Sequence, residues 1–99
     1  MLNSFDLANR EAWEKILSGH HYDDTFGEQK NDIEFLLSLI GSEPKNILEV
    51  CCGTGRVFIP LAKTGHNMTG IDYDIGMLAR LHEKAKGLTN IKYHYNETN

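Results

Sequence analysis

One turn in the sequence restricts the fold of this chain more than any other feature. The apolar run Ile47–Cys51 contains a single acid, Glu49, and breaks directly into a glycine pair, Gly53 and Gly55. Glycine lets a backbone turn tightly and lie close to a ligand, at positions where a Cβ would obstruct it. The pattern therefore predicts a buried strand, a turn at a binding site and a helix that follows the turn.

The same turn argues against two common phosphate-binding loops. A dinucleotide fingerprint, G-x-G-x-x-G, would need its last glycine at Phe58 when counted from Gly53 and Gly55. A Walker loop ends in Gly-Lys-Ser or Gly-Lys-Thr, and the chain contains neither. Glu49 points the same way, because a carboxylate near the end of a buried strand repels a pyrophosphate and is costly to bury without a cationic partner.

These residues resemble motif I of the class I S-adenosylmethionine-dependent methyltransferases, hh(D/E)hGxGxG, in which h is apolar. Glu49 matches the acid, Gly53 and Gly55 match two glycines, and Cys51 stands where the family usually has its first glycine. S-adenosylmethionine carries a sulfonium and an ammonium but no phosphate, so an acid beside the turn is compatible with it. The alternative is a generic strand-to-helix turn of another α/β domain.

A second acid follows at the spacing of nucleotide-binding βαβ units. Asn67–Asp72 is the predicted second strand, and its terminal carboxylate lies about 20 residues beyond the glycines, where such units bind ribose hydroxyls. Asp72 is therefore the candidate ribose ligand. Asp74 is better placed to cap the helix that follows.

The resemblance implies further contacts with the cofactor. Tyr73, directly after the acid, would stack on adenine, and Met77 would contact its apolar side, with an exposed tyrosine and a core methionine as the ordinary alternatives. Tyr22 would close over the cofactor, or would anchor its loop to the surface. Glu97 is the nearest match to the acid that accepts the adenine amino group after the third strand.

Apolar periodicity and glycine or proline stops predict an α-α-β-α-β-α-β order. The expected helices are Asp6–Leu17, Asp32–Ile40, Val57–Lys63 and Ile75–Lys86, and the expected strands are Ile47–Cys51, Asn67–Asp72 and Ile91–Tyr95. The polar stretch Gly19–Gly27 predicts a loop near the ligand. Pro60 is expected to bend its helix, and the continuous apolar character of strand one predicts burial on both faces.

This order implies an α/β fold with parallel strands joined by right-handed crossovers. The resemblance implies a Rossmann-like three-layer αβα sandwich with strands in the order 3-2-1. Residues 1–28 would form an N-terminal helix and a cofactor-side loop, and residues 29–99 a partial S-adenosylmethionine-binding domain. Because the family's sheet has further strands and this chain stops at Asn99, we expect the cofactor-binding half of a longer methyltransferase.

Such an enzyme would transfer a methyl group from S-adenosylmethionine to an acceptor that the sequence does not identify, leaving S-adenosylhomocysteine. A non-catalytic module that binds S-adenosylmethionine or a nucleotide, or that dimerises, is the alternative. The open edge of strand one offers a surface for a homodimer.

Composition limits the partners and the location. The net charge of −4 argues against general attraction to nucleic acids and leaves small molecules or proteins as acceptors. The chain has no apolar run of membrane-spanning length and no signal-peptide core, so we expect it in the cytoplasm. Cys51 and Cys52 are adjacent, which excludes an ordinary disulfide between them and a spaced zinc pair, and we expect two small buried thiols and no metal site.

Overall fold

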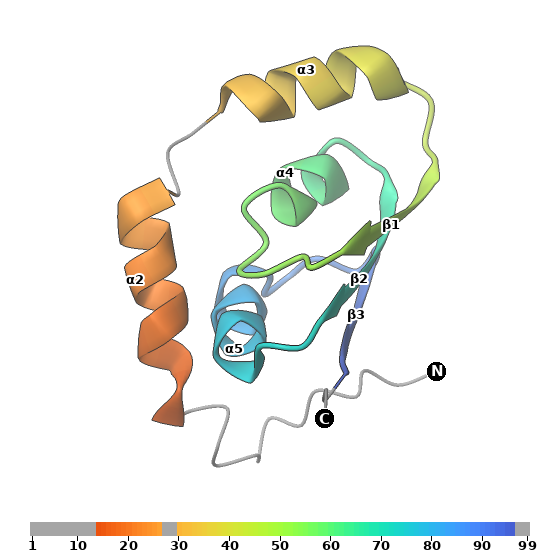
Figure 1. The fold of residues 1–99 in the computed structure, drawn as a ribbon. Coiled ribbons are helices and arrows are strands. Elements are labelled where there is room, and N and C mark those ends of the chain that lie inside the picture. Colours follow the sequence, from red (N-terminus) through yellow and green to blue (C-terminus); the bar gives the residue numbers. More distant parts are fainter. Residues whose placement is uncertain (1–13, 27–29, 97–99) are drawn as a thin grey trace.

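The computed structural model describes residues 14–26 and 30–96, and its elements follow the predicted order (Figure 1). The helices are α2 (Ile16–Phe26), α3 (Asn31–Ile40), α4 (Phe58–Lys63) and α5 (Ile75–Lys84). The strands are β1 (Asn46–Val50), β2 (Asn67–Asp72) and β3 (Ile91–Tyr95). The chain is thus an α/β fold, as its sequence pattern predicts.

The three strands form one parallel sheet with β2 between β1 and β3, which confirms the predicted order. Because the sheet grows in one direction along the chain, crossovers of the same hand place both connecting helices on the same face. Figure 1 shows α4 and α5 together on one side of the sheet. Within the described residues the sheet has helices on one side, and the second helical layer of the predicted sandwich is not among them.

The hydrophobic core lies between this face of the sheet and helices α4 and α5. Met68 of β2 is almost fully buried, and so are Phe58 of α4 and Leu78 and Leu81 of α5. Ala85, just after α5, is also buried, so Leu78, Leu81 and Ala85 mark the side of this helix that faces the core. The core fixes α5 against the sheet, and the start of this helix lies beside the site described below.

The helix ends follow local signals. α3 stops before Gly41, whose φ is 86°, as predicted. α5 begins behind Asp74, whose carboxylate accepts hydrogen bonds from the N–H groups of Gly76 and Met77 at 3.0 and 3.1 Å. Pro60 falls in the first turn of α4, where a missing N–H is tolerated, and not in the interior of a longer helix.

β1 is not buried on both faces as its apolar sequence predicts. Ile47 packs against the core, but Leu48 is 59% exposed and Val50 is 66% exposed. The reason is that β1 is the edge of the described sheet and the helices cover one face. An apolar strand with an open outer edge is a template for pairing with another strand.

The polar stretch Gly19–Gly27 is not a loop, because most of it belongs to helix α2. This segment has a weak apolar pattern, and it is held by contacts with α5. Where the two helices cross, a Cβ on Gly19 would lie 2.5 Å from Cβ of Arg80, and a Cβ on Gly76 would lie 2.3 Å from the carbonyl oxygen of Lys15. Two glycines therefore allow the helices to approach closely.

The helix predicted at Asp6–Leu17 lies mostly outside the described residues. Its last residues, Ile16 and Leu17, form the start of α2. Among the helices that the structure describes, none combines the length and the apolar character that crossing a membrane requires.

Candidate functional site

The glycine turn begins where β1 ends, and its backbone is held against β2. The N–H groups of Cys51 and Cys52 both donate to the carbonyl oxygen of Ile71, at 2.7 and 3.1 Å. The φ angles of Cys51 and Gly53 are 62° and 59°, in the left-handed region. Because a Cβ is strained in this region, Cys51 carries backbone strain that a glycine would avoid.

Asp72 fastens the turn from the end of β2. Its Oδ2 accepts a hydrogen bond from the N–H of Gly53 at 2.7 Å, and its Oδ1 accepts one from the N–H of Asp74 at 2.8 Å. The residue is 6% exposed. Its carboxylate therefore joins the glycine turn to the start of α5.

The two glycines of the turn have different surroundings. A Cβ on Gly53 would meet no protein atom within 4 Å, so this part of the backbone faces open space. A Cβ on Gly55 would lie 2.4 Å from Cδ1 of Leu81 and 3.0 Å from Ile59. Gly53 thus leaves room for a ligand, whereas Gly55 lets the turn pack against α4 and α5.

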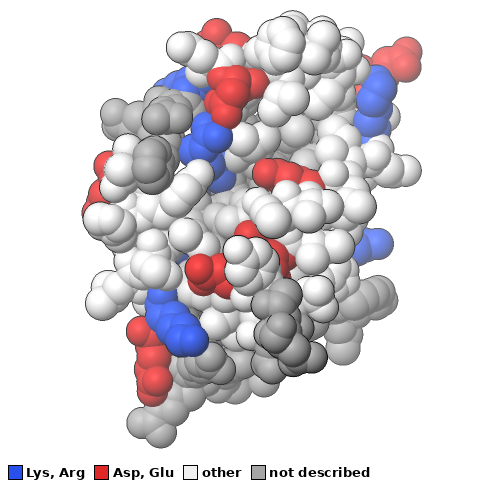
Figure 2. Space-filling model, viewed as in Figure 1, with Lys and Arg blue, Asp and Glu red and all other residues white. Residues whose placement is uncertain are grey.

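A pocket of about 330 Å³ opens at the carboxyl ends of β1 and β2. Small-molecule sites in parallel α/β sheets have this size and this position. The face drawn in Figure 2 is hollowed near its centre, and acidic side chains lie beside the hollow. The pocket is lined by Tyr22, Glu49, Cys51, Cys52, Gly53, Thr54, Arg56, Val57, Asp72, Tyr73, Asp74 and Met77.

Glu49 has an unsatisfied carboxylate in the wall of this pocket. Among the described residues, its Oε1 is buried without a hydrogen-bond partner. Burial raises the pKa of Glu49 to about 7, with a smaller lowering effect from Arg56 and a smaller raising effect from Asp72. A positive charge on a ligand would stabilise this carboxylate. The pocket is therefore suited to a cationic ligand.

Arg56 is the basic residue of the pocket lining, and two helices hold it. Its Nη1 and Nη2 donate to the two carboxylate oxygens of Asp32 on α3, at 3.1 and 2.7 Å. The bonds to Asp32 and a further one to Tyr22 of α2 raise the pKa of Arg56. The same pair lowers the pKa of Asp32. Arg56 thus ties the glycine turn to α2 and α3, and Asp32 balances its charge.

Comparison with known families distinguishes a methyltransferase turn from a generic α/β turn. The family described as "Methyltransferase domain" matches residues 47–98, which is more than half of the chain and includes β2, β3 and all of β1 except its first residue. The chain belongs to the class I S-adenosylmethionine-dependent methyltransferases. The resemblance of the Glu49 turn to motif I is thereby confirmed at the level of the family.

Two curated methyltransferases show how much of such a protein this chain represents. The ubiquinone biosynthesis O-methyltransferase of Hydrogenovibrio crunogenus is 44% identical over 64 residues, which are 63% of this chain and 26% of the relative. The 23S rRNA (uracil(1939)-C(5))-methyltransferase RlmD of Xanthomonas campestris is 34% identical over 65 residues, which are 63% of this chain and 15% of the relative. The chain therefore spans about a quarter or less of the length of these relatives.

The solved structures agree on the fold. The DhpI–SAH complex superposes with a TM-score of 0.63 at 23% identity, over 86% of this chain and 42% of that one. At this identity the likeness concerns the fold alone. It confirms that this methyltransferase chain has a Rossmann-like fold and that the described sheet is a fragment of the whole fold.

Most of the residues that the sequence predicts as cofactor ligands of the methyltransferase lie around one pocket. Its lining includes Tyr22, Glu49, Cys51, Gly53, Asp72, Tyr73 and Met77. Tyr73 is 60% exposed, so its ring borders the pocket with little cover. Gly55 is not in the lining, and Glu97 lies outside the described residues. The individual contacts of these residues with a cofactor stay predictions.

The two cysteines of the methyltransferase differ, although both are predicted to be buried. Cys51 is exposed at the pocket, because its left-handed backbone turns it away from the strand, whereas Cys52 is buried. Burial raises the pKa of the Cys52 thiol to about 12, so this side chain packs as a small neutral group. No three His, Cys, Asp or Glu side chains gather as metal ligands in the part of the chain that the structure describes.

The sequence analysis assigned no role to three polar residues around the turn, which are Thr54, Arg56 and Asp23. Thr54 stands between the two glycines, is 1% exposed, and donates from its hydroxyl to Oδ1 of Asp23 at 2.7 Å. A polar residue inside a glycine turn is a signal that could have indicated Thr54 and Arg56. Asp23 gave no such signal, because nothing in its own segment shows that it meets the turn.

Proposed function

We propose that this chain is the cofactor-binding portion of a methyltransferase that, when complete, transfers a methyl group from S-adenosylmethionine to a small-molecule or protein acceptor. The observation that carries the proposal is the environment of Glu49. Its carboxylate has a buried oxygen without a partner, in the wall of a pocket formed by the glycine turn. The turn itself lacks the residue pattern of a phosphate-binding loop.

Glu49 favours a sulfonium cofactor over a nucleotide phosphate. Its charged form would repel phosphate, whereas a cationic ligand would lower the pKa of Glu49 from about 7 and stabilise the charged form. The sulfonium and ammonium groups of S-adenosylmethionine supply positive charge. The residues present therefore fit this cofactor.

Asp72 would accept hydrogen bonds from the ribose hydroxyls. Each carboxylate oxygen has two lone pairs, and the N–H groups of Gly53 and Asp74 use one on each oxygen. Acceptor capacity remains at the point where Asp72 lines the pocket. The same side chain would then shape the turn and bind the ligand.

The adenine would contact the two apolar side chains that follow Asp72. Tyr73 and Met77 both line the pocket, and Tyr73 offers an exposed ring for stacking. Tyr22 would cover the cofactor from α2, where its hydrogen bond to Arg56 holds it. These contacts involve the start of α5, the turn and α2 together.

When bound, S-adenosylmethionine supplies an electrophilic methyl carbon on its sulfonium. The task of the protein in such a transfer is mainly to hold the cofactor and the acceptor in line. The described residues would hold the cofactor. The net charge of −4 and the acidic pocket lining support an acceptor other than a nucleic acid.

Isothermal titration calorimetry with S-adenosylmethionine, S-adenosylhomocysteine and ATP tests the proposal. We expect the first two ligands to bind and ATP to give no heat. Asp72→Ala should abolish binding, and Asp24→Ala, which removes an exposed acid of α2 outside the pocket lining, should not change it. An absence of heat with both S-adenosyl ligands would contradict the proposal.

A non-catalytic cofactor-binding module is the second candidate. It rests on the described residues of the pocket lining, which would all serve to hold the cofactor. Calorimetry does not separate the two candidates, but turnover does. Release of S-adenosylhomocysteine by the full-length natural protein, supplied with small-molecule and protein extracts, supports the enzyme, and binding without release supports the module.

A further inference from the structure

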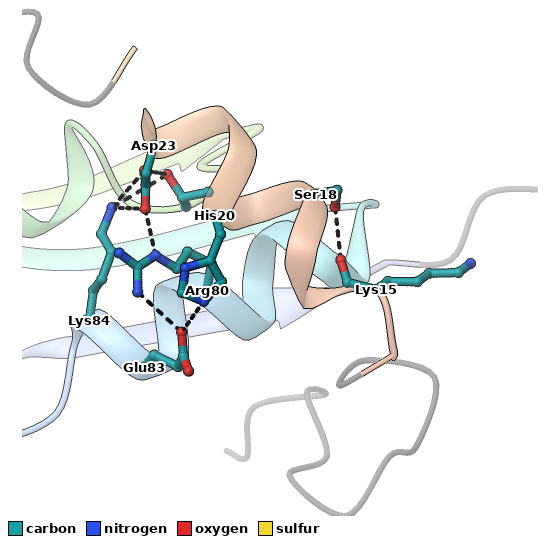
Figure 3. A network of polar contacts seen from close by, with 8 residues as sticks. Lys15, Ser18, His20, Asp23, Arg80, Glu83 and Lys84 are labelled. Carbon is teal, nitrogen blue, oxygen red and sulfur yellow. Dashed lines mark hydrogen bonds and ion pairs between the residues drawn. The ribbon is translucent and has the colours of Figure 1, made fainter. Parts of the chain in front are cut away.

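Helix α2 is attached to the rest of the molecule by a partly buried acid, Asp23. The carboxylate of Asp23 points from α2 toward α5, between Arg80 and Lys84 (Figure 3). Oδ2 accepts from Nε of Arg80 at 2.7 Å, and Nζ of Lys84 lies 3.0 Å from both carboxylate oxygens. The Asp23 side chain is 11% exposed, so these ion pairs are shielded from water much more than surface pairs are.

The same carboxylate also reaches the glycine turn. Oδ1 of Asp23 accepts a hydrogen bond from the hydroxyl of Thr54 at 2.7 Å. Thr54 is 1% exposed and lies between Gly53, which borders the pocket, and Gly55, which packs on the core. The Asp23 carboxylate therefore bonds both to α5 and to the glycine turn that lines the pocket.

Electrostatics agrees with this geometry. Burial by itself would raise the pKa of Asp23, but the hydrogen bonds from Thr54, Arg80 and Lys84 outweigh it and lower the pKa. Asp23 is therefore a carboxylate at neutral pH, with both of its oxygens engaged. A charged acceptor makes the bond from Thr54 stronger than a bond to a neutral group.

The neighbouring residue of α2 makes a parallel contact. Tyr22 bonds to Arg56, and Asp23 bonds to Thr54, so two successive residues of the helix hold the turn on either side of Gly55. Lys84 also donates from Nζ to the Thr54 hydroxyl at 3.5 Å, and the remainder of the polar network lies away from the turn. Glu83 accepts from Nη1 of Arg80 at 3.1 Å and lies 2.9 Å from Nε2 of His20, without touching the turn.

We infer that Asp23 is a positioning residue of the cofactor pocket, which acts through Thr54 to hold the glycine turn in its ligand-binding conformation. The inference rests on the proposed function, since it assigns a role in the same pocket. Asp23 does not line the pocket, so its effect on a ligand passes through the turn. A purely structural Asp23 would stabilise the docking of α2 and leave the turn unchanged.

The chain offers a matched set of variants. Thr54→Val removes the hydroxyl and keeps the branched shape, and Thr54→Ser keeps the hydroxyl. Asp23→Asn removes the charge with little change of volume. Glu83→Gln makes the same kind of change on the side of the network that does not touch the turn.

Two measurements are made on the 99-residue chain. Calorimetry with S-adenosylhomocysteine gives the affinity, and the backbone amide resonances of Gly53 and Gly55 report the turn, with those of Gly65 and Gly87 as references. We expect Asp23→Asn and Thr54→Val each to weaken binding about tenfold, and Asp23→Asn, which leaves the sequence of the turn unchanged, to shift the two turn resonances. Thr54→Ser and Glu83→Gln should stay within about twofold of the unsubstituted chain.

The double variant tests whether Asp23 acts through Thr54. If it does, Asp23→Asn adds less than about twofold to the loss that Thr54→Val already causes. The inference would be overturned if the losses of affinity in the two single variants were fully additive in the double variant. It would also be overturned if Asp23→Asn and Thr54→Val both folded and bound like the unsubstituted chain. If Asp23→Asn does not fold, the comparison of Thr54→Val with Thr54→Ser decides instead: equal affinity of these two variants would overturn the inference.

Failure of the proposed function gives a different result. If the unsubstituted chain binds neither S-adenosyl ligand, the proposed function is wrong, and the Gly53 and Gly55 resonances alone judge the positioning of the turn. Shifts in Asp23→Asn with none in Glu83→Gln support it. Unshifted Gly53 and Gly55 resonances in Asp23→Asn overturn it.

Discussion

Oδ2 of Asp72 accepts a hydrogen bond from the backbone N–H of Gly53 at 2.7 Å, which joins the end of β2 to the glycine turn after β1. The two residues lie on neighbouring parallel strands, so the bond links adjacent carboxyl ends of the sheet. The acid that the sequence predicts as a ribose ligand therefore has a structural task before any ligand arrives. Its substitution should affect stability as well as binding.

Asp72→Asn should lower the free energy of unfolding by about 1 to 3 kcal/mol, because one of two backbone N–H donors then faces an amide NH₂ instead of an oxygen. Asp74→Asn is the control, since asparagine caps a helix about as well as aspartate and the change should be nearly neutral. Urea denaturation measures both. Equal losses at the two positions would show that the bond to Gly53 has no special importance.

Glu49 should make the folded state less stable as the pH rises. Its pKa is about 7 in the folded state against 4.5 for the ordinary side chain, so the folded protein keeps a proton that the unfolded chain releases between these values. The resulting stability is fully present below pH 4.5 and is lost as the pH rises through 7. We expect a loss of about 1 to 2 kcal/mol, less than the full shift implies because Glu49 is partly exposed.

The Glu49→Gln variant isolates this effect. Burial lowers the pKa of His82, which gives stability that is lost as the pH falls and so opposes the trend from Glu49. The difference in unfolding free energy between the original chain and Glu49→Gln, measured by urea denaturation at pH 5 and pH 8, cancels His82. A difference that does not change with pH would refute the assignment.

Ligand binding should also depend on the protonation state of Glu49. If Glu49 faces the positive charge of S-adenosylmethionine, binding shifts Glu49 to its charged form and releases a proton at pH 6. The affinity should therefore rise between pH 6 and pH 8. Calorimetry in two buffers of different ionisation enthalpy counts the released proton, and Glu49→Gln should release none at this site.

Gly55→Ala should destabilise the chain more than Gly65→Ala does. Both glycines have positive φ, 86° and 107°, so alanine is strained at either position. A Cβ on Gly55 would also meet Leu81 at 2.4 Å, whereas one on Gly65 meets nothing within 4 Å. The overpacking should add about 1 to 3 kcal/mol. Thermal unfolding of both variants gives the comparison, and equal effects would contradict the packing role of Gly55.

We propose that the open edge of β1 pairs with β1 of a second copy. Leu48 and Val50 are exposed beside it, and the only charged side chain of the strand, Glu49, lies on the other face in the pocket wall. The strand thus lacks the charges that usually protect an edge. Sedimentation velocity should show association that rises with concentration, that Val50→Lys prevents and that Leu17→Lys, at an exposed site on α2, does not. A monomer at all concentrations would exclude the pairing.

Patterns of neighbouring residues in the sequence predicted the strands of the sheet well. The structure has β2 and β3 with the predicted bounds, Asn67–Asp72 and Ile91–Tyr95, because apolar alternation and nearby turn residues specify both ends. The cap at Asp74 and the stop at Gly41 are equally local signals. The residues of the pocket could be predicted for a related reason, since parallel strands bring the residues after β1 and β2 to the same edge.

The features that the sequence did not predict depend on contacts between residues that are far apart along the chain. α2 has little periodicity of its own, and its contacts are with Arg80 and Gly76, far along the chain. The apolar run of β1 does not tell whether a second layer covers it. Gly55 has the same appearance as Gly53 in the sequence, and only the position of Leu81 separates their roles.

The pairing of α2 with α5 also sets an order of events during translation. Asp23 and its partner Arg80 are 57 residues apart, and the ribosome synthesises β1, the glycine turn and β2 between them. α2 therefore leaves the ribosome long before its docking surface exists. The first described helix to be made is thus among the last to reach its place, and the pocket wall that it contributes is completed only after α5 has emerged.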